Sequence, residues 1–363
     1  MEEKEKKQSF GRRSLIFFAG ILAVIGLLSM FLCAINPFIS PNSFVLTSYF
    51  GLAFWPILFY NILILLVLIL LKSKKTWQYS LLALIIAVPG FMKSFSVKKA
   101  LVEEGNIKIM SYNTAQFYDI TDTQRDHASV KTDIIEVINS YNPDIVCFQE
   151  CGSFSKKSLK SFADKINCKY YVNELSGILI FSKYPLEDDE FTDNFNAAST
   201  FGTVKLVNAG GLGKFYVECV HLLSYGLTHD EIEYIHDAKH YIDDSETKGK
   251  SLMSKLKYGF KDRTEDTQII MKNMRKNGFP IIICGDFNDT PMSYTYRQMR
   301  KTGLKDAFLQ VGHGVGRTYC GRLPLLRIDY FWYNENIIPM TFTRHKQKLS
   351  DHYPIVMSFN VTH

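Results

Sequence analysis

Residues 280–289 read Pro-Ile-Ile-Ile-Cys-Gly-Asp-Phe-Asn-Asp. The apolar run predicts a buried strand, and the turn after it places Asp286 and Asn288 at the strand end. On its own, such a turn is more often a plain loop in which an Asp side chain bonds nearby backbone than a catalytic loop. The stretch therefore needs partners elsewhere in the chain before it indicates a function.

Other strand-like runs also end in polar side chains. We expect strands over residues 107–112, 144–148, 177–182, 214–220, 280–284, 328–333 and 354–359 and a helix over 130–141. This alternation of many strands with few helices indicates an α/β fold with layered sheets. Polar side chains at strand ends converge on one rim of a sheet. Those at or beside these ends are Asn113, Gln149, Glu150, His221, Asp286, Asn288, Asp329, Asp351 and His352.

This set has the composition of a phosphoester-hydrolysing site. Its carboxylate and amide oxygens suit Mg²⁺ or Mn²⁺ rather than zinc. The two histidines are good donors to a phosphate, and an Asp behind a His fixes its tautomer. Asp329, inside an apolar run, needs a partner, because an unpaired buried carboxylate is costly. A carboxylate that activates water beside a metal that neutralises phosphoryl oxygens completes this chemistry.

Seven short motifs hold these residues in order. They are Met110-Ser-Tyr-Asn-Thr114, Pro143-Asp-Ile-Val-Cys-Phe-Gln-Glu150, Gly177-Ile-Leu-Ile-Phe-Ser-Lys-Tyr-Pro185, Val220-His-Leu222, Gly285-Asp-Phe-Asn288, Arg327-Ile-Asp-Tyr330 and Ser350-Asp-His-Tyr-Pro354. Over about residues 105–360 the chain resembles the endonuclease/exonuclease/phosphatase superfamily, which has the deoxyribonuclease I-like fold. The resemblance implies a four-layered α/β sandwich with the active site at one edge of two packed sheets. The apolar N-terminus and the long insert at about 226–277 resemble a membrane-anchored bacterial branch.

The resemblance also implies a metal site. Glu150 would bind a divalent cation, Mg²⁺ or Mn²⁺, with Asn113 close by, and Asp351 would belong to the metal and water network. One position departs from the family, since Cys219 stands where members often have Asn, two residues before His221. That departure puts any contact from this neighbour in doubt.

The catalytic roles follow by position in the same motifs. Asp286 would orient or deprotonate the attacking water, and Asn288 would hold the phosphate or the transition state. His352 would donate to a phosphoryl oxygen and would be oriented by Asp329. His221 would contact the phosphate or assist the leaving group.

The first quarter of the chain predicts a membrane anchor. Residues 15–35 and 44–71 are uncharged, and each exceeds the roughly 20 helical residues that cross a bilayer core. A cleaved signal peptide is disfavoured, because the first run is too long and a second follows at once. A third run, about 77–95, is interrupted by Pro89 and Gly90. We therefore expect an anchor of two or three transmembrane helices in residues 1–99 and a catalytic domain in 100–363.

Charge gives the orientation of this anchor. Eight Lys or Arg and three Glu lie in residues 1–92, so this quarter carries +5 of the formal net charge of +6. Basic residues before the first run and after the second place both of those ends in the cytoplasm. If the third run lies in the interface, the catalytic domain stays inside. We favour a third span, which places the domain on the periplasmic side of a bacterial inner membrane.

The substrate stays open at this stage. From residue 101 onward the chain holds 31 basic and 33 acidic residues, so no overall positive field favours a polyanion. A nucleic acid, a phospholipid and a small phosphoester are all candidate substrates, and the bilayer is the one other partner inferred. A nuclease acting on DNA or RNA is the alternative enzyme. A catalytically silent membrane-bound binding protein is disfavoured, because every expected active-site residue type is present. No protein partner can be inferred.

Three weaker patterns have plain explanations. Ser350, Asp351 and His352 lack the Gly-x-Ser-x-Gly elbow of a serine hydrolase. His229, His236 and His240 share one helical face, but a solvated face is the expected reading without the zinc-site His-Glu-x-x-His pattern. The seven cysteines show no disulfide framework.

Overall fold

A computed structural model describes residues 2–98, 103–119, 124–175, 177–188, 194–197, 200–225, 245–273, 278–321 and 325–362. The chain forms two compact units. Unit 1 comprises Met1–Ser94 and Thr290–Arg297, and unit 2 comprises Phe95–Asp289 and Gln298–His363. Residues 99 and 100, where the sequence predicts the boundary between anchor and catalytic domain, lie outside the described residues, so that boundary stays a prediction.

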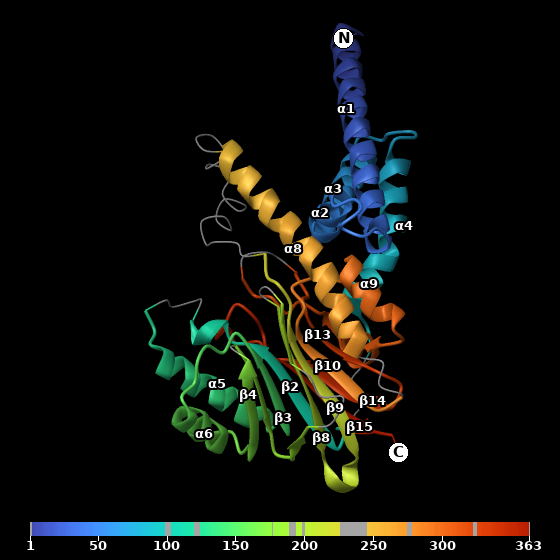
Figure 1. The fold of residues 1–363 in the computed structure, drawn as a ribbon. Helices are drawn as coiled ribbons and strands as arrows, with labels where there is room; N and C mark the ends of the chain where they lie inside the picture. The colour runs from blue at the N-terminus through green and yellow to red at the C-terminus, as the bar shows by residue number, and fades with distance from the viewer. Residues whose placement is uncertain are drawn as a thin grey trace. The chain divides into compact units, whose positions relative to one another are not determined.

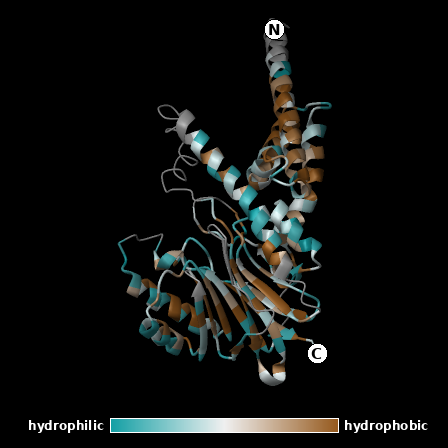
Figure 2. Ribbon diagram, viewed as in Figure 1, coloured by the Kyte–Doolittle hydropathy of each residue, from teal (hydrophilic) through white to brown (hydrophobic). Residues whose placement is uncertain are grey.

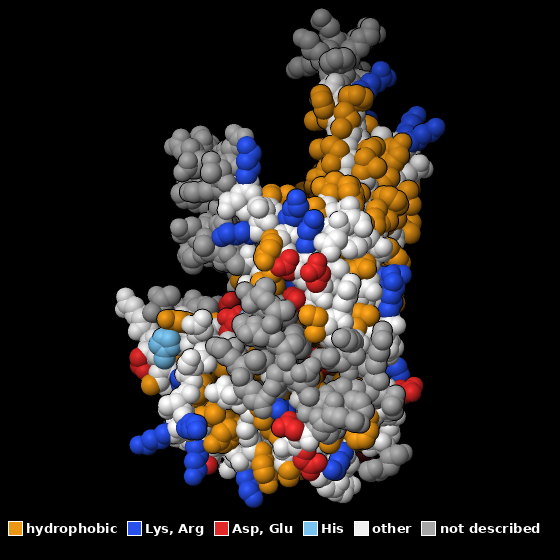
Figure 3. All heavy atoms as spheres, viewed as in Figure 1, with side chains coloured by type: hydrophobic (Ala, Val, Ile, Leu, Met, Phe, Trp, Pro, Cys, Tyr) orange, Lys and Arg blue, Asp and Glu red, His pale blue; other side chains and the backbone are white. Residues whose placement is uncertain are grey.

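Unit 1 is helical. Its elements are α1 (Glu2–Ile35), η1 (Asn36–Phe38), α2 (Leu46–Leu52), α3 (Phe54–Leu70) and α4 (Trp77–Ser94). Most exposed large apolar side chains among the described residues belong to these helices, as Figures 2 and 3 show. Apolar surface on this scale is typical of helices that face lipid or a partner rather than water.

The second predicted span is broken in the structure. A sharp bend of 72° separates α2 from α3 at Ala53. Pro56 explains the break, because proline has no backbone N–H and its ring clashes with the carbonyl four residues earlier, at Leu52. The expectation of one continuous helix over 44–71 is therefore wrong in detail.

The helices of unit 1 give limited support for membrane spans. Gly11–Phe38 is long and apolar enough to cross a membrane, and α2 with α3 meets the same criteria if the bent pair counts as one span. Helix α4 is not among the described helices that meet them. The third span stays a prediction.

Unit 2 contains two large sheets (Figure 1). The first has the strand order β14-β15-β2-β3-β5-β4, namely Ile337–Arg344, Ile355–Val361, Ile107–Asn113, Ile145–Gln149, Ile178–Ser182 and Tyr170–Leu175. The second has the order β11-β13-β10-β9-β8-β6, namely Lys305–Asp306, Asp329–Tyr333, Ile281–Asp286, Lys214–His221, Thr200–Asn208 and Leu186–Glu187, with β7 (Asn194–Ala197) paired to β8. Each strand predicted from an apolar run is present.

Apolar side chains fill the space between the sheets and behind them. Ile109 and Ile180 of the first sheet pack with Val217 and Ile282 of the second in one buried cluster. A second cluster joins the outer face of the first sheet to α5 (His127–Tyr141) and α6 (Lys156–Lys165). Figure 1 shows α8 (Ser245–Asn273) on the opposite side of the sheets from α5 and α6. The expected four-layered α/β sandwich is confirmed.

The predicted insert is partly described. Its second half forms α8, a 29-residue helix, as the prediction of a helical insert requires. His229, His236 and His240 lie outside the described residues, so their predicted solvated face stays a prediction. Two shorter elements, α9 (Tyr294–Lys301) and α10 (Ala307–Val311), follow β10 and β11.

Truncating Phe148 in β3 tests the packing behind the first sheet. Its ring is fully buried and makes edge contacts with Phe117, Phe162 and Phe181. We expect Phe148→Ala to lower the free energy of unfolding by about 3–5 kcal/mol, because it leaves a cavity among aromatic rings. Chemical denaturation measures the change. The exposed Lys160→Ala on α6 is the control, and an equal effect from both variants would contradict this packing.

Candidate active site at the edge of the two sheets

Strand register lines up the polar residues of each sheet. In the second sheet, Asp286 of β10 is paired with His221 of β9 on one side and with Asp329 of β13 on the other. In the first sheet, Asn113 of β2 is paired with Gln149 of β3, the residue before Glu150. Each sheet therefore brings its predicted site residues to one row at its end.

Asn113 joins the two rows. Its amide nitrogen donates to Oε1 of Glu150 at 3.0 Å and to Oδ2 of Asp286 at 2.9 Å. Its Oδ1 accepts from the backbone N–H of Ala115 at 3.0 Å. Because one amide holds a carboxylate from each sheet, the two carboxylates face the same space.

His352 lies between two buried carboxylates. Its Nδ1 is 2.9 Å from Oδ2 of Asp329, and its Nε2 is 3.5 Å from Oδ2 of Asp286. Burial alone would lower the pKa of His352, but the charges of Asp329, Asp286 and Asp351 raise it well above its usual value. The expectation that Asp329 needs a partner is met by this histidine.

Asp286 has an unusual environment for a carboxylate. Burial raises its pKa, the charge of His352 lowers it and that of Asp329 raises it again, which leaves the pKa at about 6. The backbone N–H of Asn288 donates to its Oδ1 at 2.8 Å. A carboxyl with a raised pKa is a stronger base than an ordinary Asp.

His221 completes the cluster beside Glu150. Its Nε2 is 3.2 Å from Oε1 of Glu150 and 3.8 Å from Oδ2 of Asp286. Burial lowers the pKa of His221, but the neighbouring Glu150 and Asp286 raise it above its usual value. Burial raises the pKa of Glu150, while His221 and Asn113 lower it to about 2.

Two of the site residues have a left-handed backbone conformation. Glu150 has φ 50° and Asn288 has φ 49°. Such residues cost of order 1–3 kcal/mol and persist only where surrounding contacts enforce them. At Asn288 the amide nitrogen donates to the carbonyl of Leu222 at 2.9 Å, which is one such contact.

The residues present fit a divalent cation. Glu150, His221 and Asp286 each offer one ligand atom, and these atoms lie within 4.8 Å of one another. Nε2 of His221 is buried and has no hydrogen-bond partner of good geometry in the described part of the chain. A cluster rich in carboxylate oxygens favours Mg²⁺ or Mn²⁺.

A profile of the "Endonuclease/Exonuclease/phosphatase family" matches residues 110–352, two thirds of the chain. The chain belongs to this family. A second profile, described as "Domain of unknown function (DUF8431)", matches residues 13–94, which are the helices of unit 1. No curated protein matches the chain.

Solved structures of the family have the same fold. An endonuclease/exonuclease/phosphatase from Beutenbergia cavernae DSM 12333 is 16% identical, with a TM-score of 0.51 over 72% of each chain. Its counterpart from Bacteroides vulgatus is 15% identical, with a TM-score of 0.51 over 70% of this chain and 98% of that one. A Bacteroides thetaiotaomicron family protein is 14% identical, with a TM-score of 0.51 over 72% of this chain and all of that one. At these identities the likeness concerns the fold alone.

All eight residues predicted for the site lie in or beside this cluster. Asp351 is the least engaged, and one of its carboxylate oxygens accepts from Oγ of Ser350 at 3.2 Å. Asn113, predicted near the metal, acts in the structure as a donor to two carboxylates. The individual roles stay predictions, whereas the position of each residue in the family fold is now known.

Cys219 lies away from the cluster. It is fully buried between the sheets, and its sulfur accepts from the Gln149 amide at 3.1 Å. The side chain at this position therefore stabilises the sandwich core in this family member. Gln149 is paired with Asn113 and precedes Glu150, so a contribution of Cys219 to the site through Gln149 stays a prediction.

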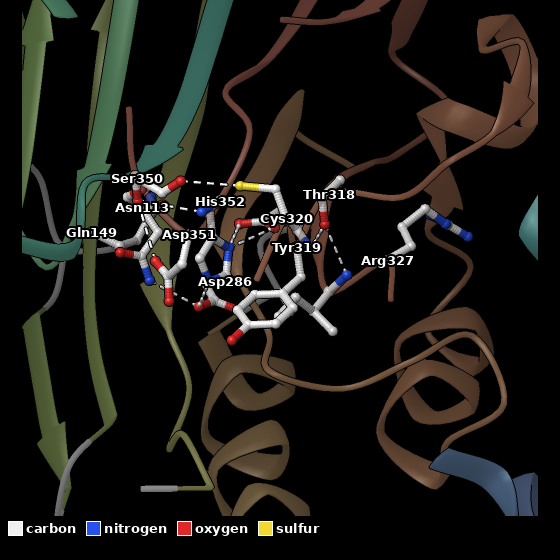
Figure 4. A network of polar contacts seen from close by, with 12 residues as sticks. Asn113, Gln149, Asp286, Thr318, Tyr319, Cys320, Arg327, Ser350, Asp351 and His352 are labelled. Atoms are coloured by element: carbon white, nitrogen blue, oxygen red, sulfur yellow. Dashed lines mark hydrogen bonds and ion pairs between the residues drawn. The ribbon is translucent and has the colours of Figure 1, made fainter. Parts of the chain in front are cut away.

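Sequence reasoning missed a supporting loop beside His352. The ring of Tyr319 contacts that of His352 edge-on at 5.4 Å, as Figure 4 shows. Oγ1 of Thr318 accepts from the backbone N–H of Asp329 at 3.1 Å, and the sulfur of Cys320 donates to the carbonyl of Ser350 at 3.0 Å. A Thr-Tyr-Cys run has no signal of its own in the sequence, because its role depends on the strand that it lies against.

Asp329→Asn tests the histidine–carboxylate pair. Loss of the charge lowers the pKa of His352, so the protonated form disappears at lower pH. If protonated His352 donates in the reaction, the alkaline limb of the pH–rate profile shifts to lower pH and kcat falls about 10²-fold or more. Steady-state kinetics across pH measure both changes. His345→Gln, outside the cluster, is the control, and an unshifted alkaline limb in Asp329→Asn would contradict the pairing.

Proposed function

We propose that this chain is a membrane-anchored, divalent-metal-dependent phosphoesterase. It hydrolyses a phosphodiester or phosphomonoester by attack of an activated water. The observation that carries the proposal is the buried row Asp329–His352–Asp286, with separations of 2.9 and 3.5 Å. This row places a protonated donor next to a carboxylate of raised pKa, which is the pairing that hydrolysis by water requires.

Asp286, His352 and His221 each have one role in this proposal. Asp286 accepts a proton from the water as its oxygen attacks phosphorus. His352, held by Asp329, donates to a phosphoryl oxygen and stabilises the charge that grows there. His221, whose pKa is also raised, donates a proton to the leaving oxygen. The products are an alcohol and a phosphate group that has gained one oxygen from water.

Glu150 and its neighbours would hold the metal. The carboxylates of Glu150 and Asp286 offer ligand atoms within 4.8 Å of each other, while the neighbouring His221 keeps its proton for the leaving oxygen. Bound there, Mg²⁺ or Mn²⁺ would neutralise phosphoryl oxygens and favour the attacking water. Asn113 would keep Glu150 and Asp286 oriented toward it through its two hydrogen bonds.

The helices of unit 1 support a periplasmic domain. The Arg12 guanidinium donates to the carbonyl of Leu71 at 3.0 and 2.9 Å, so the beginning of the apolar part of α1 lies beside the end of α3. Helix α4 follows directly from that end. Its last turns reach the start of α3, where the rings of Phe91 and Trp55 are 6.0 Å apart. Since α4 runs back along α3 to its start, the C-terminal end of α4 lies away from the basic end, which we assign to the cytoplasm.

Metal dependence tests the proposed reaction. The full-length protein in detergent is assayed with bis(p-nitrophenyl) phosphate, p-nitrophenyl phosphate, DNA, RNA and phospholipid vesicles. We expect hydrolysis with Mg²⁺ or Mn²⁺, loss with EDTA and recovery on adding metal back. Asp286→Asn is expected to lower kcat by about 10³-fold, because it removes the base. Glu187→Gln, a half-buried carboxylate of β6 that is bonded to Lys214 outside the site, is the matched control.

The same assay separates the alternatives. Cleavage of DNA or RNA without cleavage of the small esters identifies a nuclease. If no substrate is hydrolysed with either metal, the phosphoesterase proposal is wrong. The alternative of a catalytically silent membrane-bound binding protein then remains. Full activity of Asp286→Asn contradicts the assignment of the base.

Cysteine labelling tests the orientation. All seven native cysteines are buried, so introduced ones can be read separately. Asn42→Cys lies between α1 and α2, and Lys74→Cys lies between α3 and α4. With a membrane-impermeant maleimide, we expect Asn42→Cys to react in intact spheroplasts and Lys74→Cys to react only after lysis. The reverse pattern would place the catalytic domain in the cytoplasm.

A further inference from the structure

Helix α8 carries a buried arginine beside the active site. Arg263 has an exposed fraction of 0%, and its guanidinium lies 4.1 Å from the centre of the Tyr225 ring and 5.6 Å from that of Phe260. Its Nη1 donates to the carbonyl of Leu223 at 2.7 Å. Nε and Nη2 have no hydrogen-bond partner among the described residues. The charge is therefore buried with few of its donors used.

Stability alone is a poor reason for this arginine. A guanidinium loses its hydration on burial, and a well-packed apolar side chain in such a place is often as stabilising. The nearest carboxylate, Oδ2 of Asp289, is 3.7 Å from Nε. That separation is longer than a good charge-assisted hydrogen bond. The role of Arg263 is better inferred from where the two groups that it contacts lie than from the energy of those contacts.

Those two groups belong to the loops that directly follow His221 of β9 and Asp286 of β10. Leu223 follows His221 by two residues, and Asp289 directly follows Asn288. Arg263 is thus in contact with the loop after β9 and with the loop after β10.

The two loops are also bonded to each other next to the catalytic residues. The backbone N–H of Leu222 donates to the carbonyl of Asp286 at 2.9 Å, and the Asn288 amide donates to the carbonyl of Leu222 at 2.9 Å. Arg263 adds a third connection one residue further along each loop. The pairing of β9 with β10 sets the backbone spacing between His221 and Asp286. The three contacts extend that pairing into the loops, and among them only the contact from Arg263 comes from a helix.

Gly259 leaves space for the arginine. A Cβ atom at this position would lie 3.0 Å from Nη1 of Arg263 and 3.1 Å from Cδ1 of Tyr225. These separations are tighter than ordinary van der Waals contact, so any larger residue pushes the guanidinium or the ring aside. Gly259 gives a way to move Arg263 while its charge is kept.

We propose that Arg263 is a positioning residue that, from helix α8, holds the loops after β9 and β10 in place beside His221, Asp286 and Asn288. The proposal rests on the phosphoesterase function proposed above. Because Arg263 is fully buried, we expect its loss to slow the chemical step without weakening substrate binding. A misplacement of catalytic groups by about 1 Å can cost roughly 10²-fold in rate. The insert then helps to position the site residues, whereas its exposed charges alone indicate only a solvated helix.

The test uses the full-length protein in detergent with Mg²⁺ and bis(p-nitrophenyl) phosphate. The variants are Arg263→Lys, Arg263→Ala, Gly259→Ala and Gly259→Val, and Lys257→Met on the exposed face of α8 is the matched control. We expect kcat to fall about 10- to 100-fold in Arg263→Ala and Gly259→Val with KM nearly unchanged. Arg263→Lys and Gly259→Ala are expected to be intermediate.

Two readouts separate positioning from folding. Alanine is a better helix former than glycine, so Gly259→Ala is expected to keep or raise the melting temperature while kcat falls. Added guanidinium ion at low millimolar concentration is expected to restore part of the kcat of Arg263→Ala and to leave Lys257→Met unchanged. Sodium chloride at the same ionic strength is the control for the effect of added salt.

Each contrary outcome has a definite meaning. An active parent with kcat unchanged in all four variants overturns the role of Arg263 and leaves the proposed function intact. Loss of activity and of the melting transition together in Arg263→Ala, with full activity in Gly259→Val, also overturns it. An inactive parent overturns the proposed function and this inference with it.

Discussion

The site depends on one shared oxygen, Oδ2 of Asp286. The Asn113 amide from the first sheet donates to it at 2.9 Å, and His352 and His221 approach it at 3.5 and 3.8 Å. The carboxyl is buried, so it loses most of its hydration and can remain there only with such partners. The roles proposed for Asp286, His352 and His221 all depend on these contacts to one carboxylate between the two sheets.

The layered fold provides the rigidity that this meeting requires. Each row of site residues lies at the ends of buried strands. The two sheets pack against each other, and the first sheet also packs against α5 and α6. Catalytic side chains on strand ends are held more tightly than those on free loops. The loops that extend beyond the strands are then restrained by local contacts, such as those of Asn288 and Thr318.

Apolar runs were sufficient to predict the strands that carry the site, because burial on both faces leaves a continuous hydrophobic signal. Strands β4, β8 and β14 lack such a run and were not predicted. The pairing of Asp329 with His352 could be expected only in general terms, since a buried carboxylate needs a partner but the sequence does not name it. Arg263 could not be predicted at all, because a charge on a helix indicates a solvated face until the tertiary contacts are known. Pro56 is a local signal for the break between α2 and α3, whereas the uncharged run around it predicts one continuous helix.

The central claim is that water attacks phosphorus in a reaction promoted by Asp286 and His352. Hydrolysis of bis(p-nitrophenyl) phosphate in H₂¹⁸O by the full-length, Mg²⁺-supplied protein tests it most directly. The account predicts one ¹⁸O atom in the p-nitrophenyl phosphate product and none in the p-nitrophenol, read by mass spectrometry. Label in the p-nitrophenol, or in neither product, would contradict it.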